Sequence, residues 1–175
     1  MYWMNLPSPV GQLTIASDGQ AICGLWLQGQ KYYAATLEAD SVQSPERPEF
    51  HQAADWLESY FAGRIPPALP RLSLKGTPFR RAVWRLLLEI PRGQTTTYGA
   101  LAQRLRDVGI SASAQAVGGA VGHNPISILI PCHRVVGTDG SLTGYAGGVA
   151  VKRCLLELEG VDIGKLHLPR TGTAL

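Results

Sequence analysis

Short apolar runs separated by turn residues characterise the first part of the chain. Residues 12–15 alternate polar and apolar side chains, residues 17–19 have the composition of a turn, and residues 21–27 form a second apolar run. Two such runs joined by a turn predict a β-hairpin. A helix is predicted further on, because apolar residues recur at helical spacing before a glycine. These residues are Phe50, Ala54, Leu57 and Phe61, followed by Gly63.

A proline-rich connector divides the chain. Pro66, Pro67 and Pro70 stiffen a segment that ends near Gly76, and such segments commonly link domains. We therefore expect an N-terminal α/β domain with its linker over residues 1–76 and a C-terminal domain over residues 77–175.

Helical signals dominate after the connector. Thr77 is a good N-cap and Pro78 suits the first helical position. The pattern predicts a helix that ends at residues 91–93, a short second helix, and a third helix of small residues at about 113–122. Three helices with a short link before the last suggest a helix-turn-helix at about residues 95–122. The apolar positions are Phe79, Val83, Leu86 or Leu87, and Ile90 in the first helix, and Tyr98, Leu101, Ala102 and Leu105 in the second.

The last third of the chain mixes extended, turn and helical signals. Residues 126–131 are predicted to form a buried extended segment, residues 138–140 a turn, and residues 144–148 a flexible loop. A final helix is expected at about residues 149–159, with Gly160 after it. The tail after Lys165 is expected to be poorly ordered. The apolar face of the final helix is predicted to contain Val151, Leu155 and Leu158.

Composition narrows the class of protein. Hydrophobic residues make up 45% and charged residues 17% of the chain, which suits a packed core and argues against disorder. The net charge of +3 permits an anionic partner without requiring one. No apolar run reaches the length of a membrane span, and the first residues lack the pattern of a signal peptide. We therefore expect a cytoplasmic protein that does not contact a membrane.

The three cysteines, Cys23, Cys132 and Cys154, are too few and too widely spaced for a disulfide framework or a zinc site. No metal is therefore expected. Cys23 lies in an apolar run and Cys154 in the final predicted helix, so both are expected to be small buried hydrophobic residues.

Cys132 differs from the other two because it ends an apolar run just after Pro131, where the chain must turn. If the backbone bends there, His133 could be the base that generates a reactive thiolate, and a carboxylate would orient the imidazole. Spacing alone nominates Glu157 or Glu159. A buried cysteine beside a surface histidine explains the same residues.

Three stretches around Cys132 carry a specific pattern. They are Asn-Pro-Ile-Ser-Ile-Leu-Ile-Pro-Cys-His-Arg-Val-Val at 124–136, Gly-Ser-Leu-Thr-Gly-Tyr-Ala-Gly-Gly at 140–148, and Leu-Leu-Glu-Leu-Glu-Gly at 155–160. They resemble the active-site region of the O6-alkylguanine-DNA alkyltransferases, and the resemblance covers residues 77–160. It implies an α/β (α+β) fold: a small N-terminal sheet-plus-helix domain of the ribonuclease-H-like type, then a mostly helical C-terminal domain with a helix-turn-helix. The active site is expected at about residues 124–160.

The resemblance also implies roles for individual residues. Cys132 matches the residue that accepts the alkyl group, His133 the base that works through a water, and Glu159 the carboxylate that orients the histidine. Asn124 matches the residue that braces the turn, and Tyr98 the tyrosine that contacts the flipped base and the DNA backbone. Further substrate-binding or DNA-binding positions are Thr143, Tyr145 and Ala146 of the loop that closes over the guanine, Arg134, Val135, and Ala114, Gln115, Gly118 and Gly119 of the third helix. Trp84, like Val135, matches a pocket or supporting position, which a place in the apolar core explains equally well.

The implied reaction is an irreversible, stoichiometric transfer of an alkyl group, chiefly methyl, from O6-alkylguanine in double-stranded DNA to Cys132. O4-alkylthymine is a further candidate substrate. The base must leave the stack, and the third helix would lie against the minor groove. Its small residues would permit close approach to DNA, although tight packing against another helix explains them equally well. A monomer without any cofactor is expected.

One position departs from the family pattern. Gln115 stands where relatives usually carry an arginine that fills the gap left by the extruded base. Glutamine hydrogen-bonds but brings no positive charge. The departure suggests weaker DNA binding or flipping, unless Arg104 and Arg106 compensate.

Two other functions fit parts of the pattern. A non-enzymatic binder of alkylated DNA would share the fold, but such alkyltransferase-like proteins replace the nucleophile, commonly with tryptophan, so Cys132 argues against this class. A cysteine hydrolase could use Cys132, His133 and Glu159, but it would turn over and would need a path for water.

Overall fold

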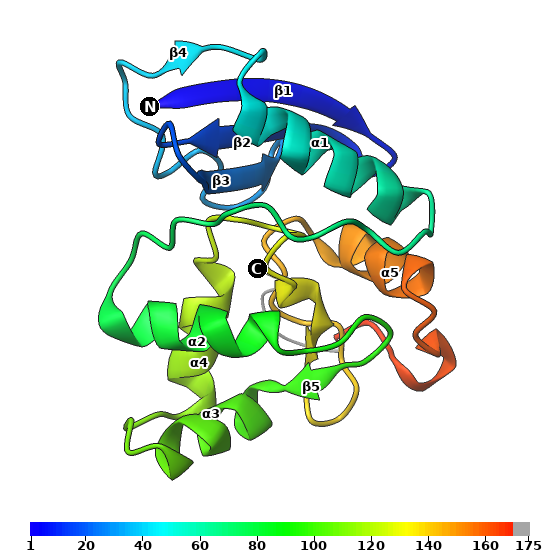
Figure 1. Ribbon diagram of the computed structural model, residues 1–175. Coiled ribbons are helices and arrows are strands. Elements are labelled where there is room, and N and C mark those ends of the chain that lie inside the picture. Colours follow the sequence, from blue (N-terminus) through cyan, green and yellow to red (C-terminus); the bar gives the residue numbers. More distant parts are fainter. Residues whose placement is uncertain (170–175) are drawn as a thin grey trace. The chain divides into compact units, whose positions relative to one another are not determined.

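The computed structural model describes residues 1–169 and divides the chain into two compact units. The first unit comprises Met1–Lys75 together with Pro125–Leu129, and the second comprises Gly76–Asn124 and the chain from Ile130 onward. Figure 1 shows strands gathered in the first unit and most of the helices in the second. Among the described residues, no helix is long and apolar enough to cross a bilayer.

A four-stranded sheet in the order β3-β2-β1-β4 forms the body of the first unit. Its strands are β1 (Tyr2–Ser8), β2 (Gly11–Ser17), β3 (Ile22–Leu27) and β4 (Val42–Gln43). β1 and β3 both pair antiparallel with β2, whereas β4 runs parallel to β1. The predicted hairpin is confirmed as β2 and β3. Its apolar runs are buried, and Cys23 is 2% exposed, as expected.

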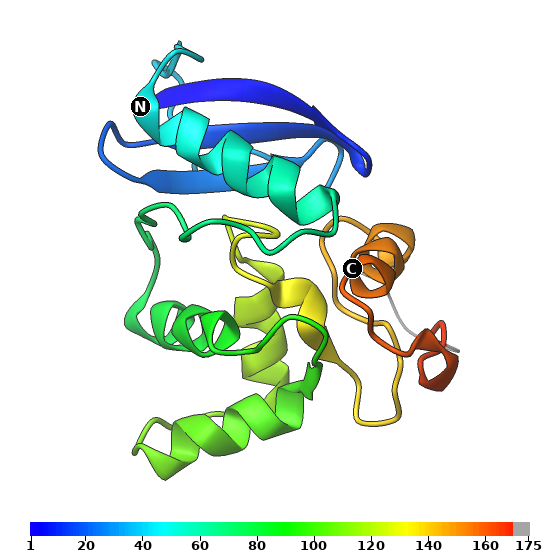
Figure 2. The same cartoon turned by 45° about the vertical axis from the view of Figure 1, so that its right-hand side comes forward.

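Helix α1 (Pro48–Phe61) lies along one face of this sheet, as Figures 1 and 2 both show. The helix was predicted, but its buried face is rotated relative to the predicted apolar positions. Ala54 and Phe61 are only partly buried and line a cavity of about 420 Å³ with residues of the β1–β2 turn region. The fully buried face contains Phe50, Ala53, Trp56, Leu57 and Tyr60.

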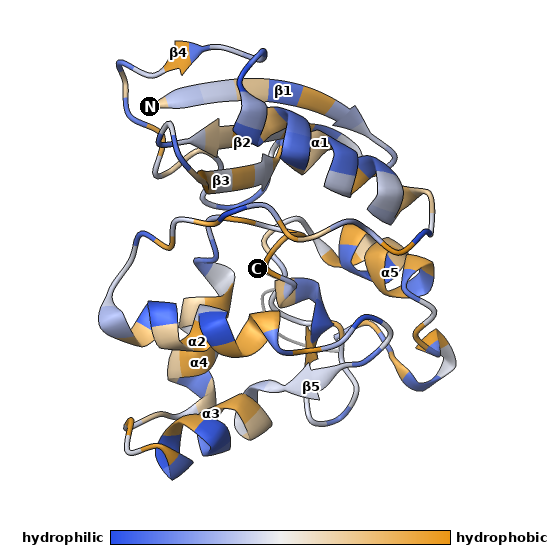
Figure 3. Ribbon diagram, in the orientation of Figure 1, coloured by the Kyte–Doolittle hydropathy of each residue, from blue (hydrophilic) through white to orange (hydrophobic). Residues whose placement is uncertain are grey.

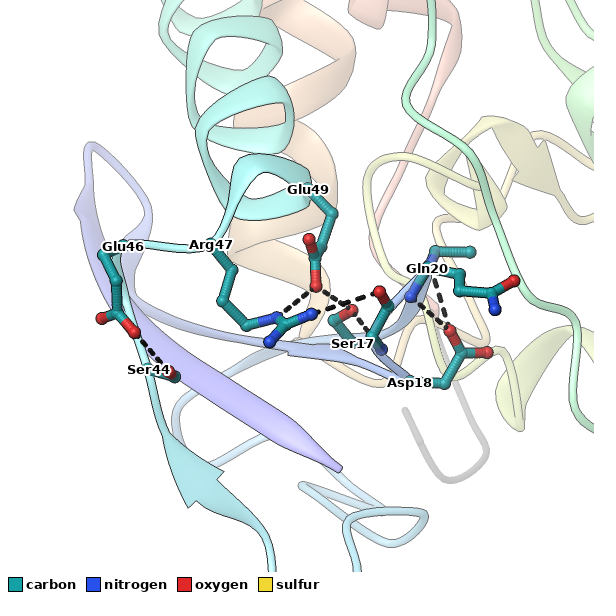
Figure 4. A network of polar contacts seen from close by, with 9 residues as sticks. Ser17, Asp18, Gln20, Ser44, Glu46, Arg47 and Glu49 are labelled. Atoms are coloured by element: carbon teal, nitrogen blue, oxygen red, sulfur yellow. Dashed lines mark hydrogen bonds and ion pairs between the residues drawn. The ribbon is translucent and has the colours of Figure 1, made fainter.

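Polar contacts fasten the start of α1 to the end of β2 (Figure 4). Arg47, the N-cap of α1, makes no side-chain capping bond. Instead its Nε donates to Glu49 at 2.6 Å, and its guanidinium lies 3.8 Å from the centre of the Tyr2 ring. Ser17 at the end of β2 also donates to Glu49, at 2.7 Å. These contacts set the position at which α1 begins on the sheet.

The segment at residues 125–129 belongs to the first unit because it pairs with β3. The Leu25 amide donates to the Pro125 carbonyl at 2.8 Å, and the Ser127 amide donates to the Leu25 carbonyl at 2.9 Å. The segment predicted to be buried and extended, residues 126–131, is buried. The prediction that it is extended throughout is wrong, because Ile128 adopts a φ of 69° within a turn. A β-branched residue rarely takes this conformation, so tertiary contacts impose it.

The second unit contains helices α2 (Pro78–Leu88), α3 (Tyr98–Asp107), α4 (Ala114–Gly122) and α5 (Val149–Leu158). Two short parallel strands, β5 (Thr96–Thr97) and β6 (Val135–Val136), and two 3-10 turns, η1 (Cys132–Arg134) and η2 (Ile163–Lys165), complete it. Side chains cap the first three helices, since Thr77, Thr97 and Ser113 each accept a bond from a backbone amide three residues on. The predicted helices, including the Thr77 cap, are confirmed.

Helix α2 packs on α4 through Trp84. Its ring is 1% exposed and its Nε1 donates to the Ala120 carbonyl at 2.8 Å. A side chain at Gly76 would clash with the same ring. Of the two leucines that the pattern allowed for the buried face of α2, Leu87 is buried and Leu86 is only partly so. Figure 3 shows this helix with hydrophobic and hydrophilic faces.

The face that α5 buries differs from the predicted one. Leu155 is buried as expected, but Lys152 and Leu156 are its buried neighbours, and Val151 and Leu158 are only partly covered. Cys154 is exposed, so the prediction that it is buried is wrong. Cys154 points away because the buried stripe runs through Lys152, Leu155 and Leu156, which face the other side of the helix.

The chain remains ordered beyond Lys165. The Leu142 amide donates to the His167 carbonyl at 2.9 Å, and the His167 amide donates to the Gly140 carbonyl at 3.1 Å. The expectation of poor order directly after Lys165 is therefore wrong as far as His167. Residues 170–175 of the predicted tail lie outside the described residues.

Candidate active site

Cys132 begins the turn η1, which follows directly on Pro131. The Cys132 amide donates to the Ile130 carbonyl at 2.8 Å, and the Arg134 amide donates to the Pro131 carbonyl at 3.0 Å. The backbone thus bends at the point where the sequence required a bend. Cys132 is 4% exposed.

Asn124 braces this turn from inside. It follows α4, is 4% exposed, and its Nδ2 donates to the Ile130 carbonyl at 2.9 Å. The same amide nitrogen donates to Cys132 Sγ at 3.1 Å. A hydrogen bond of this kind strengthens when the sulfur is ionised, so Asn124 both holds the turn and favours the thiolate.

His133, Glu159 and Arg134 form a buried polar cluster. His133 Nε2 lies 2.7 Å from Glu159 Oε1. Arg134 donates to both oxygens of the same carboxylate, at 2.8 and 2.9 Å, and its Nη1 donates to the Ile90 carbonyl at 2.5 Å. The Glu159 carboxylate is wholly buried, whereas Glu157 lies on the exposed face and pairs with Arg153. Of the two carboxylates that spacing nominated, Glu159 is the one beside the histidine.

Burial and hydrogen bonding shift the ionisation of this cluster. Burial raises the pKa of the Cys132 thiol, an effect that the Asn124 hydrogen bond and the charge of Lys152 oppose. Burial also lowers the pKa of His133, although Glu159 opposes this effect. For Glu159, burial alone would raise the pKa, but the bonds from His133 and Arg134 outweigh it and hold the pKa well below its usual range. At neutral pH the cluster therefore holds a thiol, a neutral imidazole able to accept a proton, and a carboxylate.

These shifts predict a loss of stability in acid. Unfolded histidine binds a proton below about pH 6.5 and unfolded glutamate below about pH 4.3, whereas both folded groups resist protonation. Because the unfolded chain then binds more protons, the free energy of unfolding should fall as the pH drops through about 6.5 and again below about 4.3. Urea denaturation at a series of pH values measures this.

The His133→Asn variant should lose the upper of the two steps. His51→Asn is the matched control, since His51 is exposed on α1, and it should keep the upper step. An unchanged upper step in the His133 variant would contradict the assignment.

Tyr98, at the start of α3, is tied to the loop at residues 140–148. Its hydroxyl donates to the Thr143 carbonyl at 2.9 Å, and burial raises its pKa. Gly144 has a φ of 76°, and a side chain there would clash with the Tyr98 hydroxyl. Tyr145 is 1% exposed, and its ring meets the His133 ring edge to face with centroids 6.4 Å apart. The loop is thus packed against both Tyr98 and the histidine, and Ala146 continues it at a partly exposed position.

Most of the predicted DNA-contacting residues of α4 lie on its solvent-exposed face. Ala114, Gln115 and Gly119 are exposed, whereas Gly118 is partly buried beside the Tyr98 ring. Gly118 therefore lies where α4 approaches Tyr98 of the candidate site. Among the small residues for which two explanations were open, Ala120 is buried and takes part in helix packing. Val135 and Trp84 are also core residues.

Sequence reasoning missed Lys152. This lysine is fully buried, and its Nζ donates to the carbonyls of Val135 and Thr143 at 2.5 and 2.6 Å. A signal was available, because Lys152, Leu155 and Glu159 are separated by three and four residues and thus share one face of a helix. Within residues 1–169, no group of three or more His, Cys, Asp and Glu side chains could hold a metal ion.

Two family models match the chain. The "6-O-methylguanine DNA methyltransferase, ribonuclease-like domain" matches residues 1–72, and the "6-O-methylguanine DNA methyltransferase, DNA binding domain" matches residues 78–161. Both matches support the fold expected from the sequence, a small sheet domain followed by a mostly helical part.

Two curated relatives of this chain share one name. The "Methylated-DNA--protein-cysteine methyltransferase" of Mycobacterium tuberculosis is 42% identical over 159 residues, covering 91% of this chain and 92% of the relative. The protein of the same name from Haemophilus influenzae is 42% identical over 161 residues, covering 91% and 86%.

Solved structures give the same result. Mycobacterium tuberculosis OGT in complex with DNA superposes with a TM-score of 0.81 at 40% identity, covering 95% of each chain. An O6-methylguanine DNA methyltransferase from Methanococcus jannaschii superposes with a TM-score of 0.64 at 27% identity, covering 97% and 99%. The chain therefore belongs to the 6-O-methylguanine DNA methyltransferase family.

Proposed function

We propose that this protein repairs O6-alkylguanine in DNA by a single, irreversible transfer of the alkyl group to Cys132. The observation that carries the proposal is the contact of Asn124 with the Cys132 sulfur at 3.1 Å, next to the His133–Glu159 pair at 2.7 Å. This arrangement occurs in a chain that matches named methyltransferases over nine-tenths of its length.

The bonds, electrons and protons of the transfer reaction balance without a cofactor. The Cys132 thiol gives its proton through a water to His133, whose charged form Glu159 stabilises. The thiolate attacks the alkyl carbon, a carbon–sulfur bond forms, and the bond from that carbon to O6 breaks. The electron pair stays on the guanine, which takes up one proton. The thioether is not hydrolysed, so each protein molecule acts once.

Tyr98 and the loop at residues 140–148 are suited to hold the base. In the structure the Tyr98 hydroxyl donates to the Thr143 carbonyl. The same hydroxyl can donate to the guanine ring and stabilise the negative charge that develops as the base departs. Tyr145, Ala146 and Arg134 complete the proposed substrate-binding set.

DNA is the proposed partner, and α4 its main contact. Because the O6 atom lies inside the duplex, the guanine must be flipped out. The exposed residues Ala114, Gln115 and Gly119 leave room for close approach to the minor groove. We propose that the protein acts as a monomer in the cytoplasm.

Intact-mass spectrometry tests the proposal. The chain is mixed with duplex oligonucleotides that contain O6-methylguanine, O4-methylthymine or unmodified guanine. We expect one added methyl group per chain with O6-methylguanine, none with guanine, and a slower gain with O4-methylthymine as a second substrate. Binding to O6-methylguanine DNA without a change in mass would instead indicate a non-enzymatic binder. Neither binding nor a mass change, together with hydrolysis of esters or amides, would indicate a hydrolase.

Restoring a positive charge at position 115 should strengthen DNA binding. Gln115 is exposed at the start of α4, and an arginine there would supply charge to the gap left by the extruded base. Arg106 is engaged locally with the Ala112 carbonyl at 2.8 Å, and Arg104 pairs with Glu89. We therefore expect Gln115→Arg to raise the rate of transfer to duplex DNA about tenfold, equivalent to about 1.4 kcal/mol. No gain in single-turnover rate would contradict this.

Gln115→Lys and Gln52→Arg serve as matched variants. Lysine restores charge without the planar guanidinium, so a smaller gain is expected. Gln52 is exposed on α1 of the first unit, whereas Arg104 and Arg106 belong to the second unit, and an added charge at Gln52 reports general attraction to DNA.

A further inference from the structure

The second unit contains a buried lysine that the transfer described above does not use. Lys152 on α5 is 0% exposed. Lysine is almost never fully buried without partners, because removing an ammonium from water is costly. Its presence on an otherwise apolar helix face, beside Leu155 and Leu156, therefore calls for a physical reason.

The ammonium bridges two segments of the site. It donates to the Val135 carbonyl, immediately after the turn that carries Cys132, and to the Thr143 carbonyl in the loop at residues 140–148. The Thr143 carbonyl also accepts the Tyr98 hydroxyl. Lys152 thus joins the turn that carries Cys132 to the loop at residues 140–148. Through the shared Thr143 carbonyl it is also linked to Tyr98, the proposed base-binding tyrosine.

The charge of Lys152 also acts on the nucleophile. Lys152 and Cys132 interact electrostatically, and the ammonium favours the ionised sulfur. The other charged or titratable groups in this cluster are His133 and Arg134 of η1, Glu159 after α5, and Tyr98 of α3. Arg134 is already paired with Glu159 through two hydrogen bonds. Lys152 is bonded only to neutral carbonyls in the contacts described, so its charge is available to the thiolate.

We propose that Lys152 is a positioning residue for alkyl transfer: its ammonium holds the Thr143 loop against the segment that carries Cys132, and its positive charge favours the thiolate. This inference rests on the proposed function of Cys132. Burial lowers the pKa of Lys152 to about 8, and its interaction with Cys132 acts in the opposite direction. The side chain is therefore mostly charged at neutral pH, as the proposal requires.

The test compares the wild-type chain with Lys152→Met, which keeps the volume and removes the charge, and Lys152→Arg, which keeps the charge. Two quantities are measured against pH: thiolate formation at Cys132 without DNA, by ultraviolet absorbance and by iodoacetamide labelling mapped to Cys132, and the single-turnover rate with O6-methylguanine DNA. For Lys152→Met we expect thiolate formation to move up by at least one pH unit. The transfer rate near neutral pH should fall about tenfold or more and recover as the pH is raised. Lys152→Arg should stay closer to the wild type in both.

Identical thiolate titrations in the wild-type chain and Lys152→Met would overturn the proposal. So would a loss of rate that is equal at every pH and is not reduced by arginine, because that result describes a purely structural lysine. If Lys152→Met does not fold by circular dichroism, Lys152→Gln, which retains a donor but no charge, is judged by the same criteria. Arg153→Met, which removes an exposed charge from the next position of α5, should match the wild type. The thiolate measurement needs no DNA, so it decides the inference even if the wild-type chain accepts no methyl group.

Discussion

Replacing Cys132 with serine is expected to abolish methyl transfer and to leave DNA binding intact. The serine hydroxyl is a far weaker nucleophile than the cysteine thiolate, whose formation the Asn124 hydrogen bond favours. Removal of a nucleophile costs on the order of 10⁶-fold in a well-studied hydrolase, and an effect of that size leaves no detectable product here. Intact mass after incubation with O6-methylguanine DNA measures transfer, and a band-shift titration measures binding.

Cys154→Ser is the matched control for this experiment. Cys154 is exposed on α5, close in sequence to the site but on the opposite side of the helix from its buried face. This variant should accept one methyl group as the wild type does. A methyl group recovered on Cys154 or Cys23 in the wild-type chain would show that Cys132 is not the acceptor.

The substitution Glu159→Gln is expected to weaken both the reaction and the fold. Glutamine cannot balance the charge of Arg134 or stabilise a protonated His133, which both contact this carboxylate. Loss of one member of a buried ion pair costs about 3–5 kcal/mol. Loss of the group that orients a catalytic base costs about 10²–10⁴-fold in rate. Urea denaturation and single-turnover transfer measure the two effects.

Glu157→Gln separates these effects from a general loss of charge. Glu157 pairs with Arg153 across one turn of α5 on the exposed surface, and exposed pairs of this kind contribute about 0.3–0.5 kcal/mol. It should therefore retain wild-type stability and rate. Equal losses in the two variants would contradict the assignment of Glu159 as the carboxylate that serves His133.

Local signals were readable in the sequence because they act over a few residues. The Thr77 side chain caps α2 by accepting a bond from an amide three residues away, and Pro78 suits the first turn regardless of what surrounds it. The sharp turn after Pro131 was expected for the same reason. The pattern around Cys132 also specified the family, since its ordered motifs extend over about half of the chain.

The orientation of helices on their neighbours was harder to predict. In α5, positions 155, 156 and 158 are all leucine, so the sequence pattern does not distinguish them. Packing in the folded protein determines which of them are buried. The buried face of α5 is rotated relative to the predicted face, so that Cys154 is exposed and Lys152 is buried. A lysine was not expected in the core because its carbonyl partners, Val135 and Thr143, are brought to it by segments distant in the chain.

The sequence by itself determined the order of the elements and the family, and it singled out Cys132 as the cysteine expected to react, because these depend on local spacing and on motifs. Tertiary structure alone decided that Ile128 takes a left-handed conformation, that Lys152 joins two segments of the site, and that Leu156 rather than Leu158 is buried on α5. Each of these depends on groups that are far apart along the chain. Their energies come from burial and from hydrogen bonds that exist only once the chain has folded.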